Sequence, residues 1–264
     1  MPKRQGEKMP LINDLELMKV KTEKKEKNFG LFVIEPLMPG YGITLANSLR
    51  RVILASIAGS AITSVKINNC THEFDTVKGV REDLVELIMN LKSMRVKSNS
   101  DDDEVIKLKI NGPKIITATD FLKNPQVDIL EPEHYIAEIE KGGKLSIDAT
   151  VRRGTGYLPT ESREDEKLAL GHIAVDAIFT PIKKINYQVE NTRVGQITNY
   201  DKIIIGITTD GSIDPEAALS SGAQILTEHY SSILNQTKTE EKPATKKVKK
   251  STKKTTNAKA KNKK

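Results

Sequence analysis

Two amphipathic helical patterns near opposite ends of the chain constrain the fold more than any other feature. The first covers residues 43–58, where apolar residues recur at helical spacing and Thr44 is the expected N-cap. The second begins at Asp214-Pro215, a favourable pair for the N-cap and first turn of a helix. The stretch between them consists mainly of alternating patterns typical of strands. Because strands and helices do not alternate regularly, we expect an α+β fold in which one domain is interrupted by an inserted one.

A third helix is expected over residues 80–94, where apolar residues again recur on one face. Glu82 and Asp83 in its first turn and Lys92 near its end suit the helix dipole. Residues 1–28 are charged, and we expect them to be irregular. The expected strands are 30–37, 61–68, 104–110, 144–151, 172–190 and 201–211.

Cysteine content and hydropathy exclude several protein classes. Cys70 is the single cysteine of the 264 residues, so no internal disulfide can form. Secreted disulfide scaffolds and cysteine-rich zinc modules are therefore excluded. The sequence has neither an apolar run typical of a signal peptide nor 18 consecutive uncharged apolar residues. We expect a soluble cytosolic protein.

The positive charge is concentrated at one end of the chain. The formal net charge is +7, but residues 238–264 contain twelve lysines and two glutamates, so the remainder is slightly negative. This tail has too few apolar groups to fold, and we expect it to be disordered. It is suited either to non-specific contact with nucleic-acid phosphates or to solubility alone. With five Phe, six Tyr and no Trp, a surface that stacks on bases is not expected.

Patterns typical of catalysis or metal binding are weak. His72 follows Cys70 by two residues and Asp75 is nearby, but a metal site needs three or four converging ligands. A turn at the end of a strand explains the same pattern. The four histidines show no metal-binding spacing to one another. We therefore expect no catalytic residue, no metal site and no cofactor.

Two loops have alternative interpretations. Residues 153–157, Arg-Gly-Thr-Gly-Tyr, resemble a phosphate-binding loop but lack a third glycine, a following helix and the P-loop lysine. A tight turn between strands is the stronger interpretation. Residues 101–104 are acidic, but consecutive carboxylates do not converge on a cation, so a solvated loop is favoured.

Two adjacent arginines, Arg50 and Arg51, lie within the otherwise apolar first helix. They either extend along the surface into solvent or bind carboxylates of a partner through their planar guanidinium groups. From this feature alone the first alternative is favoured.

Five segments carry a resemblance to one family. Residues 40–67 contain a Gly-Tyr-Gly turn, then Thr-Leu-Ala-Asn-Ser-Leu-Arg-Arg, then an apolar helix end. This pattern resembles the alpha subunits of bacterial-type DNA-directed RNA polymerases, including those of plastids. The resemblance covers about residues 28–234. The further matching segments, in order, are 72–92, 151–159, 175–205 and 208–226.

The resemblance implies two lobes. A discontinuous dimerisation domain would comprise residues 1–58 and 174–235, and the inserted domain residues 59–173. Residues 236–264 would form the disordered lysine-rich tail. Because few residues follow the last expected helix, we do not expect the carboxy-terminal DNA-binding domain found in many members of the family.

The resemblance also implies partners and contact residues. A homodimer would nucleate assembly of the polymerase, with one protomer binding the beta subunit and the other binding beta-prime. The beta contact maps to Arg50, Arg51 and Leu54, and the beta-prime contact to Glu86 and Lys92. The implied dimer interface comprises Leu45, Leu49, Leu219, Ala223, Leu226 and Tyr230.

Such a scaffold would have no active site of its own and would work in the bacterial cytosol or nucleoid, or in a plastid. A separate hypothesis is a non-specific nucleic-acid-binding protein that acts through its basic tail. The slightly negative charge of the rest of the chain argues against that hypothesis as the main role.

Overall fold

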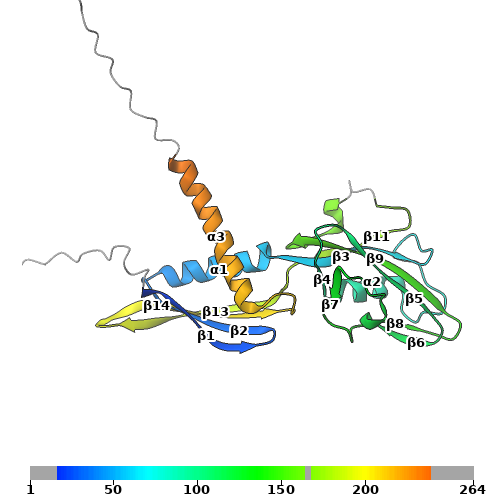
Figure 1. The fold of residues 1–264 in the computed structure, drawn as a ribbon, viewed down its shortest axis with the longest axis horizontal. Coiled ribbons are helices and arrows are strands. Elements are labelled where there is room, and N and C mark those ends of the chain that lie inside the picture. Colours follow the sequence, from blue (N-terminus) through cyan, green and yellow to red (C-terminus); the bar gives the residue numbers. More distant parts are fainter. Residues whose placement is uncertain (1–16, 164–167, 239–264) are drawn as a thin grey trace, which may run out of the picture. The chain divides into compact units, whose positions relative to one another are not determined.

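The computed structural model describes residues 17–163 and 168–238. It confirms a mixed fold made mostly of strands (Figure 1). Short 3-10 helices cover Ala118–Asp120 and Thr160–Arg163. The other elements, in chain order, are β1 (Lys19–Glu26), β2 (Phe29–Leu37), α1 (Tyr41–Ser56), β3 (Ala58–Ile67), α2 (Leu84–Ser93), β4 (Val96–Ser98), β5 (Glu104–Asn111), β6 (Lys114–Thr117), β7 (Val127–Ile129), β8 (Tyr135–Ile139), β9 (Lys144–Thr155), β10 (Tyr157–Leu158), β11 (Ile173–Ala174), β12 (Ala177–Ile178), β13 (Ile182–Val194), β14 (Ile197–Thr209) and α3 (Pro215–Lys238).

One hydrophobic core lies between α1 and an antiparallel sheet with the strand order β1-β2-β14-β13. Ile203, Ile205 and Ile207 alternate along β14 and are fully buried, because every second side chain of a strand points to the same face. α1 and the first turns of α3 cover that face (Figure 1). We call this cluster the α1 core. It joins β2 and α1 to β13, β14 and α3, which lie far along the sequence.

The first strand of this sheet was not expected from the sequence. β1 pairs antiparallel with β2 at the edge of the sheet, within the 1–28 segment predicted to be irregular. All eight of its residues are exposed. Because neither face of β1 is buried, its sequence lacks the alternation of apolar and polar residues by which a strand is predicted.

The start of α1 also differs from the prediction. The helix begins at Tyr41, after Gly40 in a left-handed conformation (φ 84°), and Thr44 is not its N-cap. The cap comes instead from Asp201 on β14, whose Oδ2 accepts hydrogen bonds from the backbone N–H groups of Gly40 at 2.9 Å and Gly42 at 2.8 Å. The Thr44 hydroxyl donates to the Gly40 carbonyl oxygen at 3.4 Å. A residue 159 positions further along the chain therefore satisfies the free N–H groups of the helix.

We expect Asp201→Ala to lower the free energy of unfolding by about 2 kcal/mol, because it removes a cap and leaves buried N–H groups without acceptors. Asp201→Asn keeps one acceptor oxygen and should cost about half as much. Urea unfolding of both variants measures the difference. An Asp201→Ala chain as stable as the unchanged one would show that this carboxylate does not hold the start of α1.

A second core lies between α2 and a sheet with the strand order β5-β9-β3-β4-β7, in which β11 also pairs with β3. Leu84, Leu87 and Leu91 of α2 are at most 1% exposed and pack on this sheet. The Asp83 carboxylate caps the helix by accepting from the Glu86 backbone N–H at 2.7 Å. We call this cluster the α2 core.

α3 begins as its sequence predicts. The Asp214 carboxylate accepts from the Glu216 backbone N–H at 3.3 Å, and Pro215 opens the helix. Gly222 marks a close approach of α3 to α1, because a Cβ atom there would lie 2.5 Å from Ile53 Cγ1. Glycine at this position allows the two helices to pack together.

The predicted domain boundaries at 58/59 and 173/174 stay predictions. The α1 core and the α2 core are separate clusters, but the chain divides by its contacts only within α3, into units 1–227 and 228–264. α3 continues through Lys238, so the first three residues of the expected tail are helical. The rest of that tail, from residue 239, lies outside the described residues.

Candidate subunit interfaces

α1 presents the two arginines that the resemblance assigns to the beta contact. Arg50 and Arg51 are exposed, and within the described ranges no carboxylate or carbonyl oxygen pairs with either guanidinium. Arg50 borders a groove of about 640 Å³ together with Leu31 and Lys184. Leu54 is half-buried and packs against the α1 core. The two cations are therefore free in the single chain to bind a partner, and the fold does not depend on their charge.

The six residues implied in the dimer interface differ in exposure. Leu49 is only 8% exposed and belongs to the α1 core, so it supports α1 from the inside. Ala223 is exposed, and Tyr230 is 58% exposed. The remaining three are half-buried against the α1 core: Leu45, Leu219 and Leu226.

α3 exposes further apolar side chains that the prediction did not include. Ile233 and Leu234 are 58% and 52% exposed. They follow Tyr230 by three and four residues, which places all three side chains on one side of the helix. The sequence contains this signal, because Leu226, Tyr230 and Ile233 recur at helical spacing. An apolar stripe without a covering element is typical of a surface that binds another protein.

Lys92, near the end of α2, forms an ion pair that the sequence did not indicate. Its Nζ lies 2.9 Å from Asp176 Oδ2, and Asp176 Oδ1 accepts from the Thr160 backbone N–H at 3.0 Å. The hydrogen bond from Lys92 and that from Thr160 lower the pKa of Asp176 to about 2. The carboxylate is therefore ionised throughout the physiological pH range and anchors the end of α2 to the segment before β12.

A cleft of about 470 Å³ opens beside Lys92 and Asp176. Its rim is apolar, with Phe74 77% exposed and Met89 63% exposed. Val85 lines the same cleft and lies one helical turn before Met89. The helical pattern identified the buried face of α2 but not this second, exposed apolar face.

Glu86 does not share this cleft. Its side chain is exposed near the start of α2, and it is not among the residues that line the cleft beside Lys92. The structure therefore brings one of the two predicted beta-prime contact residues, and not the other, into the apolar cleft.

The pattern around Cys70 forms a turn after β3. The Cys70 backbone N–H donates to the Ile67 carbonyl oxygen at 3.0 Å, and the Thr71 N–H donates to Asp75 Oδ2 at 3.2 Å. His72 Nε2 lies 3.5 Å from Asp75 Oδ1. In the part of the chain that the structure describes, no three His, Cys, Asp or Glu residues are placed to hold a metal ion.

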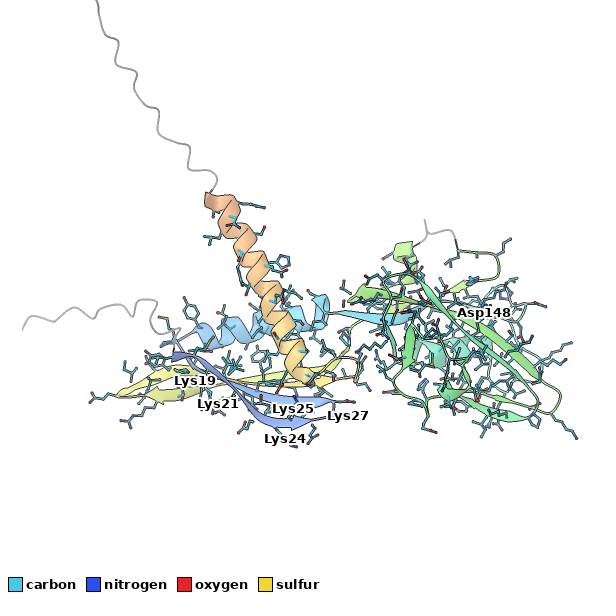
Figure 2. All side chains as sticks on the ribbon, in the orientation of Figure 1. Lys19, Lys21, Lys24, Lys25, Lys27 and Asp148 are labelled. Carbon is cyan, nitrogen blue, oxygen red and sulfur yellow. The ribbon has the colours of Figure 1, made fainter. Side chains whose placement is uncertain are left out.

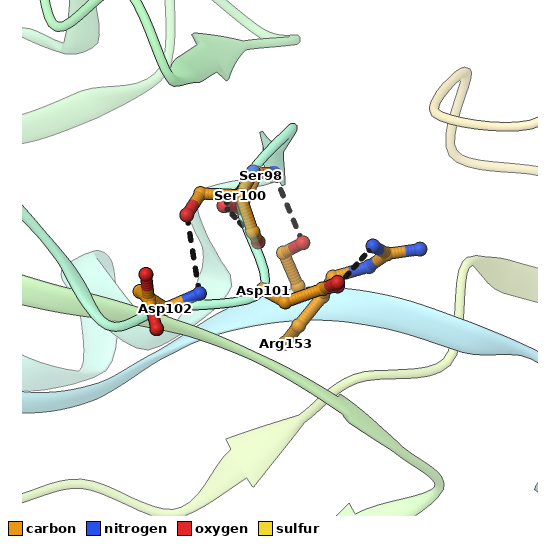
Figure 3. Close-up of polar contacts among 6 residues, drawn as sticks. Ser98, Ser100, Asp101, Asp102 and Arg153 are labelled. Atoms are coloured by element: carbon orange, nitrogen blue, oxygen red, sulfur yellow. Dashed lines mark hydrogen bonds and ion pairs between the residues drawn. The ribbon is translucent and has the colours of Figure 1, made fainter.

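Arg152 and Arg153, at the end of β9, form ion pairs with the acidic loop and leave no open anion site there; Figure 3 shows the pair between Arg153 and Asp101. The Arg153 guanidinium donates to Asp101 at 2.6 Å, and Arg152 makes two hydrogen bonds to Asp103 at 2.7 and 2.8 Å. Gly156 has φ 66°, as a tight turn requires. The turn between strands is thus the correct interpretation, and the acidic loop 101–104 serves as its partner.

Within the described ranges no helix is both long and apolar enough to cross a membrane.

Comparison with known proteins places this geometry in a family. Residues 65–180, which contain most of the α2 core, match the family described as the RNA polymerase Rpb3/RpoA insert domain. The chain is 47% identical over 222 residues to the DNA-directed RNA polymerase subunit alpha of Carboxydothermus hydrogenoformans, a match that covers 84% of this chain and 71% of that protein. The chain belongs to the family of DNA-directed RNA polymerase alpha subunits. The subunit alpha of Moorella thermoacetica is also 47% identical over 224 residues, covering 85% of this chain and 72% of that protein.

Membership in this family confirms the resemblance found in the sequence and places the chain in transcription as a polymerase subunit. The arginines of α1, the stripe on α3 and the cleft beside Lys92 thus belong to a chain whose family works within a larger assembly.

Proposed function

We propose that the chain is the homodimeric assembly scaffold of a DNA-directed RNA polymerase. One protomer binds the beta subunit and the other binds beta-prime, in the cytoplasm where transcription takes place. The exposed apolar stripe on α3, in a chain of this family, is the observation that carries the proposal.

The stripe supports the homodimer. Ala223, Tyr230, Ile233 and Leu234 expose small or apolar side chains along α3. A two-fold axis would bring the same surface of a second copy against them, since an interface of this symmetry is self-complementary. Leu45, Leu219 and Leu226, half-buried against the α1 core, would lose their remaining exposure there.

The arginines of α1 support the contact with the beta subunit. Arg50 and Arg51 are exposed and unpaired within the described ranges, so a partner's carboxylates can bind them without breaking an existing ion pair. Arginine suits such a contact because its planar guanidinium binds a carboxylate through two hydrogen bonds. Leu54 would add an apolar contact beside them.

The cleft beside α2 supports the contact with beta-prime. Lys92 and Asp176 provide opposite charges at its wall, and Phe74 and Met89 provide exposed apolar surface. An apolar cleft with a few fixed polar groups is typical of a specific binding surface. Glu86 would contact the same partner outside the cleft, near the start of α2.

The chain has no catalytic role in this proposal. The large partners would carry out nucleotidyl transfer. This chain would form a dimer that presents two copies of each contact surface to them. The different partners of the two protomers would arise during assembly, because the two chains are identical.

A double substitution tests the dimer without disturbing the single chain. Ala223→Glu with Tyr230→Glu places two carboxylates in the stripe at exposed positions, so we expect a folded monomer where the unchanged chain is a dimer. Ser232→Glu adds a charge at an exposed position on the opposite side of α3 and should leave the dimer intact. Sedimentation equilibrium measures the mass of each variant, and circular dichroism reports its folding. A double variant that keeps the mass of a dimer would refute the assignment of the stripe.

A further inference from the structure

The sheet with the order β5-β9-β3-β4-β7 carries a cluster of four lysines on the face opposite α2, apart from Lys97 of β4, which is exposed further along the same face. They are Lys66 on β3, Lys107 and Lys109 on β5, and Lys144 on β9, and all four side chains are exposed. Their neighbours along the strands, such as Leu108, are buried in the α2 core, so the lysines point away from that core. We call these four residues and the surface between them the lysine face.

The strand register brings the four residues together. Lys66 and Lys107 both lie opposite Asp148 of β9, one from each neighbouring strand. Lys109 lies two residues beyond Lys107 on the same face, and Lys144 continues that face of β9. With about 4.8 Å between strands and about 6.8 Å between alternate residues, the four positions cover a surface roughly 10–15 Å across.

These lysines differ in ion pairing from the lysines on the β1-β2-β14-β13 sheet. On the helix-free face of the β1-β2-β14-β13 sheet, Lys21 pairs with Glu35 at 3.0 Å and Lys202 pairs with Glu190 at 2.8 Å. Figure 2 labels Lys21 on β1 among the lysines of that sheet. On the lysine face, no carboxylate of the described residues forms an ion pair with any of the four ammonium groups.

Asp148 is the one carboxylate between the lysines of this face, and Figure 2 labels it on the larger sheet. It lies between Lys66 and Lys107 and partly neutralises both. Ser146 and Thr150, the residues that flank Asp148 on the same face of β9, have neutral hydroxyl groups that donate hydrogen bonds. The face therefore has a net positive charge and additional donors.

We propose that the lysine face binds the phosphate backbone of duplex DNA without reading its sequence. Ammonium groups and hydroxyls are the donors that contact phosphate oxygens in such interfaces. Duplex DNA has one negative charge per about 1.7 Å of its axis, so a surface 10–15 Å across meets several phosphates at once. No aromatic residue lies among these positions, so the face lacks the groups on which single-stranded bases stack. This surface is separate from the subunit contacts proposed above, and the inference does not depend on them.

The test compares two full-length variants that lose the same charge. One replaces Lys66, Lys107, Lys109 and Lys144 with Gln, and the control replaces Lys19, Lys21, Lys24 and Lys202 with Gln. Fluorescence anisotropy with a labelled 20-base-pair duplex, measured between 50 and 200 mM salt, gives the affinity and its salt dependence. The lysine-rich segment after residue 238 is present in both variants, so its contribution cancels.

We expect the lysine-face variant to bind more weakly and the slope of log affinity against log salt to become shallower by about 3.6, at about 0.9 for each lost phosphate contact. The control variant should change this slope by less than about 0.9, the contribution of a single phosphate contact. Equal losses in the two variants would show that net charge alone governs binding and would overturn the proposal, as would an unchanged slope in the lysine-face variant.

Asp148→Asn gives a prediction of the opposite sign. Removing the carboxylate between Lys66 and Lys107 should tighten binding about threefold, because its negative charge repels the phosphates and partly neutralises the two ammonium groups. Asp128→Asn removes a carboxylate from β7, outside the lysine face, and is the matched control. If Asp148→Asn tightens binding no more than Asp128→Asn, the duplex does not contact this face. Thermal unfolding of all variants separates a loss of binding from a loss of folding.

Discussion

Gly59→Ala is expected to destabilise the chain by about 3 kcal/mol or more, enough to abolish folding in a marginally stable domain. Gly59 lies on β3, directly after α1, and a Cβ atom there would lie 1.9 Å from the backbone carbonyl oxygen of Phe179. A side chain could move aside, but this obstacle is backbone, held by the hydrogen bond from the Phe179 N–H to the Gly156 carbonyl oxygen at 2.9 Å. The overlap can be relieved only by displacing strands.

Gly206→Ala is the matched control for this substitution. Gly206 also lies within a strand, but its added Cβ would have its nearest contacts at 3.5–3.7 Å, which are ordinary van der Waals distances. We expect it to leave the free energy of unfolding unchanged within about 1 kcal/mol. Urea unfolding, or the soluble yield where Gly59→Ala does not fold, measures the contrast. Equal stability of the two variants would contradict the close packing of residue 179 on β3.

Arg51→Ala is expected to weaken binding of the beta subunit by about 2–5 kcal/mol, which is at least about 30-fold in affinity. Truncation would leave a partner carboxylate buried without its cation. Stability should not change, because Arg51 is exposed and makes no described contact with its own fold. Arg51→Lys keeps the charge but loses the two-pronged geometry, so its effect should be intermediate.

Lys92→Ala provides the cross-control, since that residue is assigned to the other large partner. It should weaken binding of beta-prime and leave binding of beta unchanged, whereas Arg51→Ala should do the reverse. Titration of each variant with each large subunit separates the two effects. A loss of beta binding in both variants, or loss of folding in Arg51→Ala, would show that the arginine does not act through a direct contact.

Local patterns were sufficient to predict the elements whose structure is determined locally. Asp214-Pro215 starts α3, and its cap lies two residues before the N–H group that it binds. The apolar periodicity of residues 80–94 identified the buried face of α2, and alternation identified β5, β9 and much of β13. In each case the period of the buried side chains follows from the geometry of one element.

Contacts between residues far apart in the sequence could not be predicted from local patterns. The cap of α1 comes from Asp201, 159 residues after one of the N–H groups that it binds, and Lys92 pairs with Asp176 across 84 residues. No local pattern encodes either contact. The polar strand β1 was not predicted because neither of its faces is buried. The cleft beside Lys92 was not predicted because the sequence does not distinguish an exposed apolar residue such as Met89 from a buried one.

The interface residues themselves came from the family resemblance rather than from their chemistry. From the sequence around Arg50 and Arg51 alone, extension of both side chains into solvent was favoured over contact with a partner. Both arginines are exposed in the single chain, which agrees with either alternative. Only measurements with the partners present distinguish the two.

The most direct test of the scaffold role is the mass of the complex that the chain forms with its large partners. The chain, co-expressed with the beta and beta-prime subunits of its source and purified through a tag on the alpha chain, would be examined by native mass spectrometry. The account predicts one species containing two copies of this chain and one copy of each large subunit, with a free dimer as its precursor. A complex containing a single copy of this chain, or a chain that binds neither large subunit, would contradict it.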